Sequence, residues 1–208
     1  MGVFTSAAEI PFDDFPEKFV LKATHGSGWT IVCKNKASFD QNAAIEEMSG
    51  WLKRNFYREG REWPYKELQP RIVAEVYLEG ENGEPPPDLK IFCFHGEPKI
   101  IQVDSDRFVE HRRNMLDTEW NRLPFEFEYP ASKHSLEKPG NLSKILETAR
   151  RLAKPFPFVR VDLYSIGDRI YFGELTFYPE KGAGRFSPRR YDEMLGSYLD
   201  LTRVSAGI

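Results

Sequence analysis

The chain has 208 residues, 40% of them hydrophobic and 29% charged, a composition that supports a folded core in one domain or in two lobes around a cleft. Its 29 Lys and Arg residues against 32 Asp and Glu residues give a net charge of −3, so we expect no partner among nucleic acids or anionic membranes and only local phosphate binding. No apolar stretch approaches the roughly 20 residues of a membrane-spanning helix, and the first ten residues lack the pattern of a signal peptide, which predicts a soluble cytoplasmic protein.

The first part of the chain combines a hairpin, a helix and a further strand. Alternating apolar and β-branched residues predict strands at 18–23, 29–34 and 71–78. Ser38 is expected to cap a helix that runs to about Asn55. The two cysteines, Cys33 and Cys93, lie inside apolar strand-like runs, so we expect them to be core residues in a reducing compartment.

The second part begins with a loop at 79–87, which is rich in proline and glycine. We predict two hairpins and two helices after it, with an irregular segment of short strands at 106–130 between the first hairpin and the helices. The predicted strands are 89–95 with 98–104, joined by a type II′ turn at Gly96-Glu97, and 158–164 with 170–177, joined by a turn at 165–168. The predicted helices are 141–154 and, after a glycine-rich loop at 178–186, 188–201. Hairpins interleaved with three helices along the whole chain predict an α+β fold.

The loop Thr24-His25-Gly26-Ser27-Gly28 joins the first two predicted strands, with Lys22 just before it and Lys34 soon after it. Exposed amides on a flexible loop and two amines can hold a polyphosphate. The loop is neither a Walker loop nor a dinucleotide fingerprint, because a strand follows it. An ordinary solvent-exposed turn remains the local alternative.

Two carboxylates, Asp162 and Glu174, lie in the last predicted hairpin. Strand alternation places Arg160 with Asp162 on one face and Glu174 with Thr176 on one face. An odd-length loop brings Asp162 and Glu174 to the same side, whereas an even loop without a bulge separates them. Adjacent carboxylates need a cation between them, and Mg²⁺ would suit. The alternative is a simple ion pair between Arg160 and Glu174.

Lys90 and Glu75 are charged residues within apolar strands. Lys90 either snorkels to solvent, pairs with an acid or contacts a ligand. For Glu75, exposure at a strand edge is the simpler interpretation. The four histidines lack metal-ligand spacing, and no nucleophilic triad pattern is present, so zinc enzymes and triad hydrolases are disfavoured.

The order of these features resembles the ATP-grasp superfamily, specifically the TupA-like branch linked to teichuronopeptide and other cell-surface polysaccharide biosynthesis. The resemblance spans most of the chain and is carried by Lys18-Phe-Val-Leu-Lys-Ala-Thr-His-Gly-Ser-Gly-Trp29, Asp88-Leu-Lys-Ile-Phe-Cys-Phe-His-Gly-Glu-Pro-Lys99, Gln102-Val-Asp-Ser-Asp-Arg107, Phe156-Pro-Phe-Val-Arg-Val-Asp-Leu-Tyr164 and Gly173-Glu-Leu-Thr-Phe-Tyr-Pro179. It implies one ATP-grasp module whose two α+β subdomains, approximately 1–78 and 79–208, clasp a nucleotide with antiparallel sheets.

The resemblance also implies roles for individual residues. Nucleotide contacts would come from Lys22, from His25, Gly26, Ser27 and Gly28 closing over the triphosphate, from Lys34, from the hinge Glu75, Tyr77 and Leu78, and from Asp88. Lys90 and Arg107 would face the γ-phosphate, while Arg160 would stabilise the transferred phosphoryl group. Asp162 and Glu174, with Thr176, would hold Mg²⁺.

The implied activity is that of an ATP-dependent ligase, which joins a carboxylate to an amine through an acyl-phosphate. Its substrates would be small molecules or polymer precursors, with Arg112, Arg113, Arg185 and the 58–63 loop as acceptor-binding candidates. The sequence sets no oligomeric state. Two departures from the family pattern stand out: Glu174-Leu-Thr176 replaces Glu-x-Asn, and the chain opens at a point inside the pattern, so part of the acceptor site is expected to be missing.

Two other functions stay open on the residues alone. A glycosyltransferase of the same pathways would use a metal-binding Asp-x-Asp motif, and Asp104-Ser-Asp106 has that form. A non-catalytic ATP-binding protein would fit Thr176 and the short N-terminus relative to the family pattern.

Overall fold

The computed structural model describes residues 1–80, 83, 85–105 and 110–202. The chain divides into two compact units, Met1–Leu78 and Glu79–Ile208. Each unit has a hydrophobic core of its own. The two units are described separately below.

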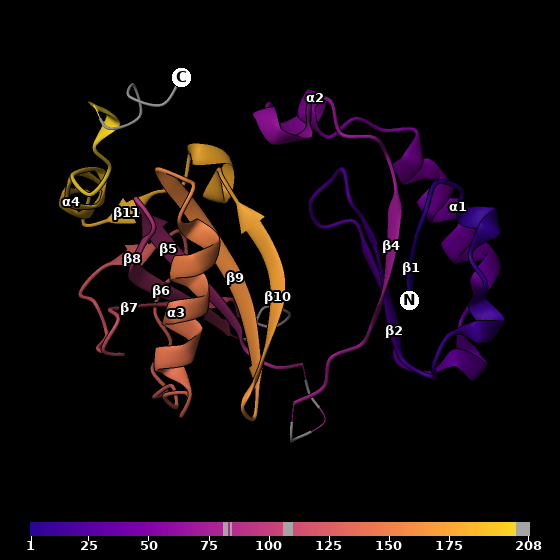
Figure 1. Cartoon of the computed structure of the whole chain (residues 1–208), viewed down its shortest axis with the longest axis horizontal. Coiled ribbons are helices and arrows are strands. Elements are labelled where there is room, and N and C mark those ends of the chain that lie inside the picture. Colours follow the sequence, from indigo (N-terminus) through magenta and orange to yellow (C-terminus); the bar gives the residue numbers. More distant parts are fainter. Residues whose placement is uncertain (81–82, 84, 106–109, 203–208) are drawn as a thin grey trace. The chain divides into compact units, whose positions relative to one another are not determined.

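The first unit is built on a four-stranded antiparallel sheet in the order β1-β4-β2-β3. Its strands are β1 (Gly2–Phe4), β2 (Phe19–Ala23), β3 (Thr30–Cys33) and β4 (Ile72–Val76). Helix α1 (Gln41–Leu52) lies along one face of this sheet (Figure 1). Strand alternation turns Phe19 and Leu21 toward that core, where both are fully buried, and leaves Val20 and Lys22 on the opposite face.

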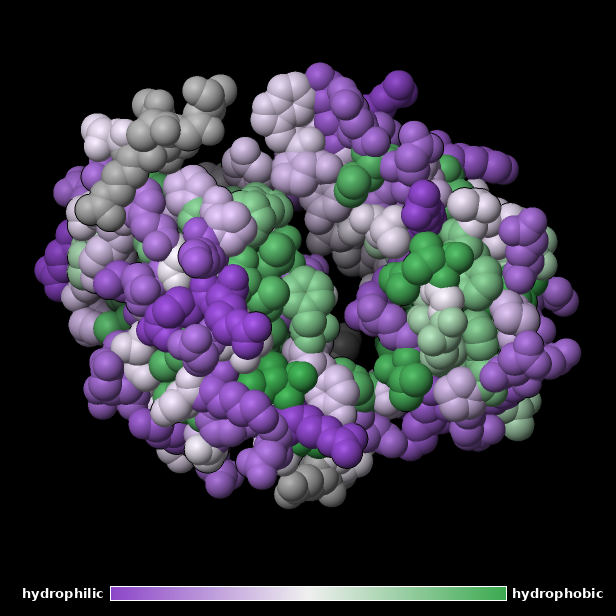
Figure 2. All heavy atoms as spheres, viewed as in Figure 1, coloured by the Kyte–Doolittle hydropathy of each residue, from purple (hydrophilic) through white to green (hydrophobic). Residues whose placement is uncertain are grey.

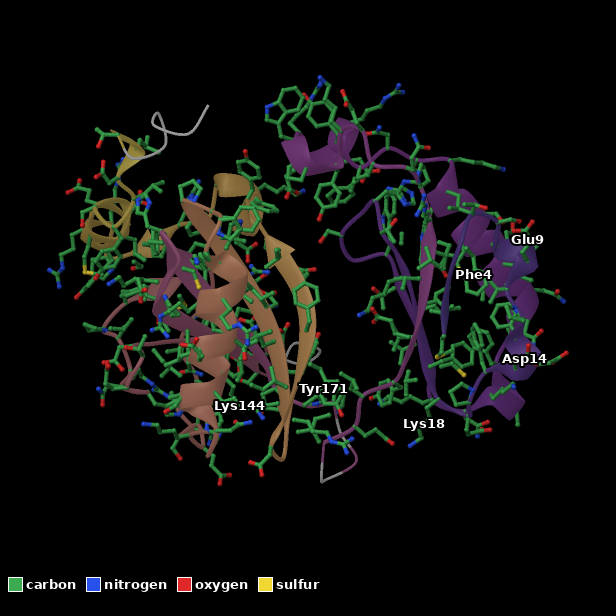
Figure 3. All side chains as sticks on the ribbon, in the orientation of Figure 1. Phe4, Glu9, Asp14, Lys18, Lys144 and Tyr171 are labelled. Carbon is green, nitrogen blue, oxygen red and sulfur yellow. The ribbon has the colours of Figure 1, made fainter. Side chains whose placement is uncertain are left out.

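Short helices complete the first unit. They are α2 (Tyr57–Gly60) and the 3₁₀ helices η1 (Ala7–Glu9), η2 (Phe12–Asp14), η3 (Lys36–Ser38) and η4 (Trp63–Tyr65). Figure 3 shows Phe4 directed toward the core of this unit, while Glu9 and Asp14 point outward. The amphipathic N-terminal segment therefore packs on the core through its aromatic residues.

The predicted helix cap at Ser38 is wrong. Asp40 caps α1, because its Oδ1 accepts a hydrogen bond from the Ala43 amide at 3.0 Å. Ser38 instead ends the preceding 3₁₀ helix, where its amide and its hydroxyl both donate to Asn35. Two polar residues near one helix start compete for the cap, and local turn geometry decides between them.

The second unit contains a five-stranded antiparallel sheet in the order β10-β9-β5-β6-β7 and a small sheet of β8 and β11. The strands are β5 (Asp88–Phe94), β6 (Glu97–Ser105), β7 (Arg112–Leu116), β8 (Glu126–Phe127), β9 (Phe158–Ile166), β10 (Arg169–Thr176) and β11 (Phe186–Ser187). The helices are α3 (Leu142–Ala153), α4 (Arg190–Gly196) and the 3₁₀ helix η5 (Pro179–Gly182). Antiparallel sheets with helices packed on them confirm the predicted α+β class.

Helix α3 covers one face of the large sheet (Figure 1). Its buried residues, among them Ile145 and Ala149, pack on Leu89 and Ile91 of β5. Hydrophilic side chains gather over the outer side of α3 (Figure 2). The opposite face of β5 carries Lys90 together with Phe92 and Phe94, which pack in a separate hydrophobic cluster.

The predicted type II′ turn at Gly96-Glu97 is also wrong. Phe94 pairs with Glu97, so the two loop residues are His95 and Gly96. Both have positive φ, 49° and 82°, which is the geometry of a type I′ turn. The turn therefore lies one residue earlier than glycine preference alone suggested, and His95 adopts the left-handed conformation.

Both cysteines are free and buried, as predicted. Burial raises the pKa of the Cys93 thiol to about 12. An unfolded cysteine ionises above its reference value of 9.0, so ionisation in this pH range favours the unfolded state. We expect the free energy of unfolding to fall by about 1.4 kcal/mol per pH unit between pH 9 and 12, relative to Cys93→Ala. Urea unfolding of both proteins across this range measures the difference in slope, and parallel slopes would contradict the assignment.

Among the described residues, no helix has the length and apolar character needed to cross a bilayer.

Candidate functional site

Charged side chains form a row across neighbouring strands on the sheet face that α3 leaves uncovered. Glu174 of β10 lies opposite Asp162 of β9, and Asp162 lies opposite Lys90 of β5. Gln102 of β6 continues the row beside Lys90. Arg160 and Thr176 are paired one step along the same strands. The fold therefore brings together most of the charged residues predicted in this unit.

A β-bulge places Glu174 on the same face as Asp162. Ile166 pairs with Arg169, so the hairpin loop has two residues, which is an even number, and the shift between Phe172 and Glu174 restores the common face. The bulge residue is Gly173. A Cβ atom there would lie 2.9 Å from the Asp162 carbonyl oxygen. Of the arrangements left open by the sequence, the structure has an even loop with a bulge, and this bulge places the two carboxylates on one face.

Gly173→Ala should therefore disturb the site without removing any charged group. The added methyl meets backbone rather than a flexible side chain, so we expect a destabilisation of about 1–3 kcal/mol from overpacking. Glu174 should also move away from Asp162, which amide chemical shifts of β9 and β10 would report. A control is Gly140→Ala, where nothing lies within 4 Å of the added Cβ. Unchanged stability and shifts in Gly173→Ala would contradict the bulge geometry.

Asp162 is the centre of a buried ion cluster. Its Oδ1 accepts from Arg160 Nε at 2.7 Å, and its Oδ2 accepts from Arg160 Nη2 at 2.8 Å and from Lys90 Nζ at 2.6 Å. Lys90 also donates to Asp88 Oδ2 at 2.5 Å. The Asp162 side chain is only 3% exposed. Lys90 is therefore ion-paired between two carboxylates and does not snorkel to solvent.

Glu174 differs from Asp162 in exposure. Its side chain is 62% exposed, and its Oε1 accepts from Thr176 Oγ1 at 2.6 Å and from Arg160 Nη2 at 3.3 Å. Arg160 thus makes its shorter contacts to Asp162 and only a longer one to Glu174. The simple pairing of Arg160 with Glu174 is the minor part of this arrangement.

Burial and charge act in opposite directions within the cluster. Burial raises the pKa of Asp162, against the lowering effect of Lys90 and Arg160. Burial alone would lower the pKa of Arg160, but Asp162 and Glu174 outweigh it and raise that pKa. The ionised form of Asp162 consequently depends on its two cationic neighbours.

The oxygen ligands in the cluster fit a divalent cation at Glu174 better than at Asp162. Mg²⁺ prefers one or two carboxylates together with phosphate oxygens and water. Glu174 presents an exposed carboxylate beside the Thr176 hydroxyl. Both oxygens of Asp162 already accept from cations, so Asp162 can join a metal only when Lys90 and Arg160 turn to another anion. In the described part of the chain, no group of three or more His, Cys, Asp or Glu residues has a metal-binding arrangement.

A second buried network adjoins this row. The Gln102 amide donates to both Asp104 oxygens at 3.0 and 3.1 Å, and Arg113 Nε donates to Asp104 at 2.7 Å. Arg113 Nη1 also donates to Glu180 at 2.8 Å. Sequence reasoning gave Gln102 and Glu180 no role, although strand alternation alone places Gln102 on the face of Lys90. Arg113 is only 4% exposed and donates to Asp104, Glu180 and the Phe127 carbonyl, so the predicted acceptor-binding role does not fit it.

A second group of predicted residues lies in the first unit. Lys22 Nζ contacts Glu75 Oε2 at 2.5 Å, with side chains 35% and 44% exposed. Lys34 Nζ lies 6.0 Å from the centre of the Tyr77 ring. Lys22, Glu75 and Lys34 thus lie on or beside the face of the sheet that α1 does not cover, and Leu78 ends the unit.

The glycine-rich loop has one buried and several accessible members. The His25 imidazole is 2% exposed, and its Nε2 lies 2.8 Å from the Trp51 carbonyl oxygen. Ser27 and Gly28 are exposed, and Gly28 has a φ of 76°. Gly26 has no room for a side chain, because an added Cβ would lie 2.4 Å from the Trp29 ring. The imidazole therefore anchors the loop, and accessible backbone remains at Ser27 and Gly28.

Five predicted residues do not join either group. Arg107 and Asp106 lie outside the described residues. Arg112 pairs with the neighbouring Glu110. The Arg185 amide donates to Glu128, while Arg58 belongs to a basic pocket of the first unit.

Comparisons with known proteins gave one family match and several similar solved structures. A family model described as TupA-like ATPgrasp matches residues 1–200. Among solved structures, D-alanine–D-alanine ligase from Bacillus anthracis complexed with ATP is 14% identical, with 84% of this chain and 45% of that chain covered and a TM-score of 0.45. The ATP-grasp ligase PsnB complexed with minimal precursor, Mg and ADP is 13% identical, with 87% and 46% covered and a TM-score of 0.45.

This chain spans less than half of the length of those two structures. A search of curated proteins gave no match. The family model nevertheless covers nearly the whole chain, and it confirms the resemblance drawn from the motifs. The chain belongs to the TupA-like ATP-grasp family.

Proposed function

We propose that this protein is an ATP-dependent carboxylate-amine ligase that forms an amide through an acyl-phosphate, in the synthesis of a cell-surface polysaccharide. The observation that carries the proposal is the pairing of Lys90 and Arg160 with Asp162, beside the exposed Glu174. Phosphoryl transfer needs positioned positive charge and metal ligands rather than a protein nucleophile. The cluster supplies both kinds of group.

In this proposal, the two units contribute different parts of the nucleotide site. Lys22 binds the α- and β-phosphates, and Ser27 with Gly28 approaches the triphosphate through the backbone. The hinge from Glu75 to Leu78 holds the adenine and ribose. Lys90 faces the γ-phosphate, and Arg160 stabilises the transferred phosphoryl group.

Lys90 and Arg160 have a second task in the proposal, because they neutralise Asp162 before the nucleotide arrives. A triphosphate carries more negative charge than one carboxylate, so it competes for both cations. As they turn toward the phosphates, Asp162 becomes available to hold Mg²⁺ together with Glu174 and Thr176. When bound, the ion would neutralise charge on the phosphate oxygens.

The reaction then runs in two steps. A carboxylate oxygen of the acid attacks the γ-phosphorus, and ADP leaves, which gives an acyl-phosphate. The amine attacks the carbonyl carbon, and phosphate leaves as the amide forms. The residues of this chain position the groups and offset their charge, while both nucleophiles come from the substrates.

The proposal is tested by measuring ADP release with each combination of a carboxylic acid and an amine. We expect turnover that requires both a carboxylate and an amine, with phosphate and amide formed in equal amounts. Lys90→Met should remove turnover, whereas the exposed and distant Lys133→Gln should not. A rate of ATP hydrolysis that is the same with every mixture of acid and amine would overturn the ligase assignment.

A non-catalytic ATP-binding protein is the second candidate, and Thr176 supports it. A hydroxyl at this position replaces the amide of the Glu-x-Asn pattern, and it already donates to Glu174. This candidate expects ATP binding without turnover under any acceptor mixture. The glycosyltransferase alternative has less support, because Asp104 is buried and paired with Arg113 rather than open to a metal.

A further inference from the structure

The first unit contains a basic pocket of about 260 Å³ that lies outside the face carrying Lys22 and Glu75. Its lining includes His25, Lys53, Arg54, Asn55, Arg58 and Tyr65. Three cationic side chains line the pocket, and no acidic residue does. Such a lining favours a small anion over a neutral or cationic ligand.

The three cations differ in their availability. Arg54 donates to Glu59 at 2.6 and 3.1 Å and lies 4.3 Å from the centre of the Trp29 ring. Lys53 and Arg58 are exposed, and neither makes a side-chain hydrogen bond or ion pair with the described residues. Two positive charges at the pocket are thus uncompensated there.

His25 also lines this pocket, and one of its ring nitrogens has no hydrogen-bond partner among the residues that the structure describes. The Trp51 carbonyl can only accept, so Nε2 of His25 is the donor of their 2.8 Å hydrogen bond. Nδ1 is buried and has no hydrogen-bond partner in the described part of the chain. A buried polar atom without a partner is costly, and a ligand in the pocket would remove that cost.

Helix α1 ends at this pocket, and its C-terminus explains part of the charge. Basic residues near a helix C-terminus offset the helix dipole, which accounts for Lys53 and Arg54. The dipole does not account for Arg58, which follows in the next short helix, or for the unpartnered Nδ1 of His25. These two features point to a ligand.

We propose that this pocket binds a small oxyanion, a carboxylate or a phosphate group, between Arg58, Lys53 and the imidazole of His25, which takes up a proton at Nδ1 as the anion binds. Arg58 and Lys53 supply the charge, and Nδ1–H of His25 donates the directional hydrogen bond. Because His25 belongs to the glycine-rich loop, the bound anion would contact that loop directly. The further step, that the anion is a group of the acid substrate, rests on the proposed function.

Nuclear magnetic resonance of the ¹⁵N-labelled imidazoles tests anion binding in the full chain without ATP. His25→Gln assigns the His25 signals among the four histidines. Sodium phosphate and sodium acetate are titrated separately at constant ionic strength, with sodium chloride as the balancing salt. We expect saturable shifts of the His25 signals, at least about tenfold weaker affinity in Lys53→Gln/Arg58→Gln, and wild-type affinity in the matched Lys133→Gln/Arg151→Gln control.

The two anions separate the sources of the ligand. Tighter acetate binding assigns the pocket to a carboxylate, and tighter phosphate binding assigns it to a phosphate group. His25 signals that do not move with either anion, or that saturate equally in Lys53→Gln/Arg58→Gln, would overturn the proposal. Since ATP is absent, this result is independent of the ADP-release assay.

Discussion

Asp162→Ala should lower the free energy of unfolding of the Glu79–Ile208 unit by about 3–5 kcal/mol, the range for breaking a buried ion pair from one side. The substitution leaves Lys90 and Arg160 in a buried position without the carboxylate that both contact. Asp88 would still pair with Lys90, and Glu174 would remain at 3.3 Å from Arg160. Desolvation of the Arg160 guanidinium is therefore the main cost.

Hydrogen exchange of the β5 and β9 amides at neutral pH measures this loss in the unit concerned. Glu174→Gln is the matched control, because Glu174 lies beside Asp162 but is exposed, and we expect a change within about 0.5 kcal/mol. Adding Arg160→Met to Asp162→Ala should recover part of the stability, since it removes the buried charge that loses its closest partner. Equal exchange in Asp162→Ala and Glu174→Gln would show that Asp162 is not the centre of the cluster.

Lys22→Ala should weaken ATP binding by about 10- to 150-fold, which corresponds to the loss of one charge-assisted contact of roughly 1.5–3 kcal/mol. Lys22 and its partner Glu75 are both partly exposed, so their ion pair contributes no more than about 1 kcal/mol to the stability of the fold. The effect on the nucleotide should therefore be separable from an effect on stability.

Calorimetric titration of Mg²⁺-ATP into the folded variant checks this expectation. Lys133→Ala removes the same charge from an exposed position in the other unit and should bind as the wild type does. Thermal unfolding of the three proteins should agree closely. An affinity of Lys22→Ala equal to that of the wild type would remove Lys22 from the nucleotide site.

Alternation of side chains made most of the strands predictable. The predicted strand at 18–23 corresponds to β2 (Phe19–Ala23), and the predicted strand at 71–78 to β4 (Ile72–Val76). The same rule placed Lys90 on the face of Phe92 and Phe94, opposite Leu89 and Ile91. Such predictions need only the period of the strand, which the residues themselves carry.

Features that depend on one-residue shifts were not predictable. The loop of the last hairpin has an even number of residues, and only the bulge at Gly173 brings Glu174 opposite Asp162. Nothing in the local sequence fixes a bulge, because it depends on how the two strands pair. The turn at His95 and Gly96 was placed one residue too late for the same reason.

The burial of charged residues was the other feature that could not be predicted from the sequence. The pair Arg112-Arg113 suggests two surface residues. Arg113 is nevertheless buried, because Asp104 and Glu180 compensate its charge. Glu180 lies far along the chain and is brought near by the fold. Long-range ion pairs of this kind cannot be found from local patterns.

The most direct test of the central claim is calorimetric titration of Mg²⁺-ATP into the 208-residue chain, alongside Lys22→Ala and Glu174→Gln proteins that are shown to be folded. The proposed site predicts saturable binding by the wild type, with affinity reduced at least about tenfold in Lys22→Ala and metal dependence weakened in Glu174→Gln. Binding of equal affinity and equal metal dependence in all three proteins, or no binding by the folded wild type, would contradict it.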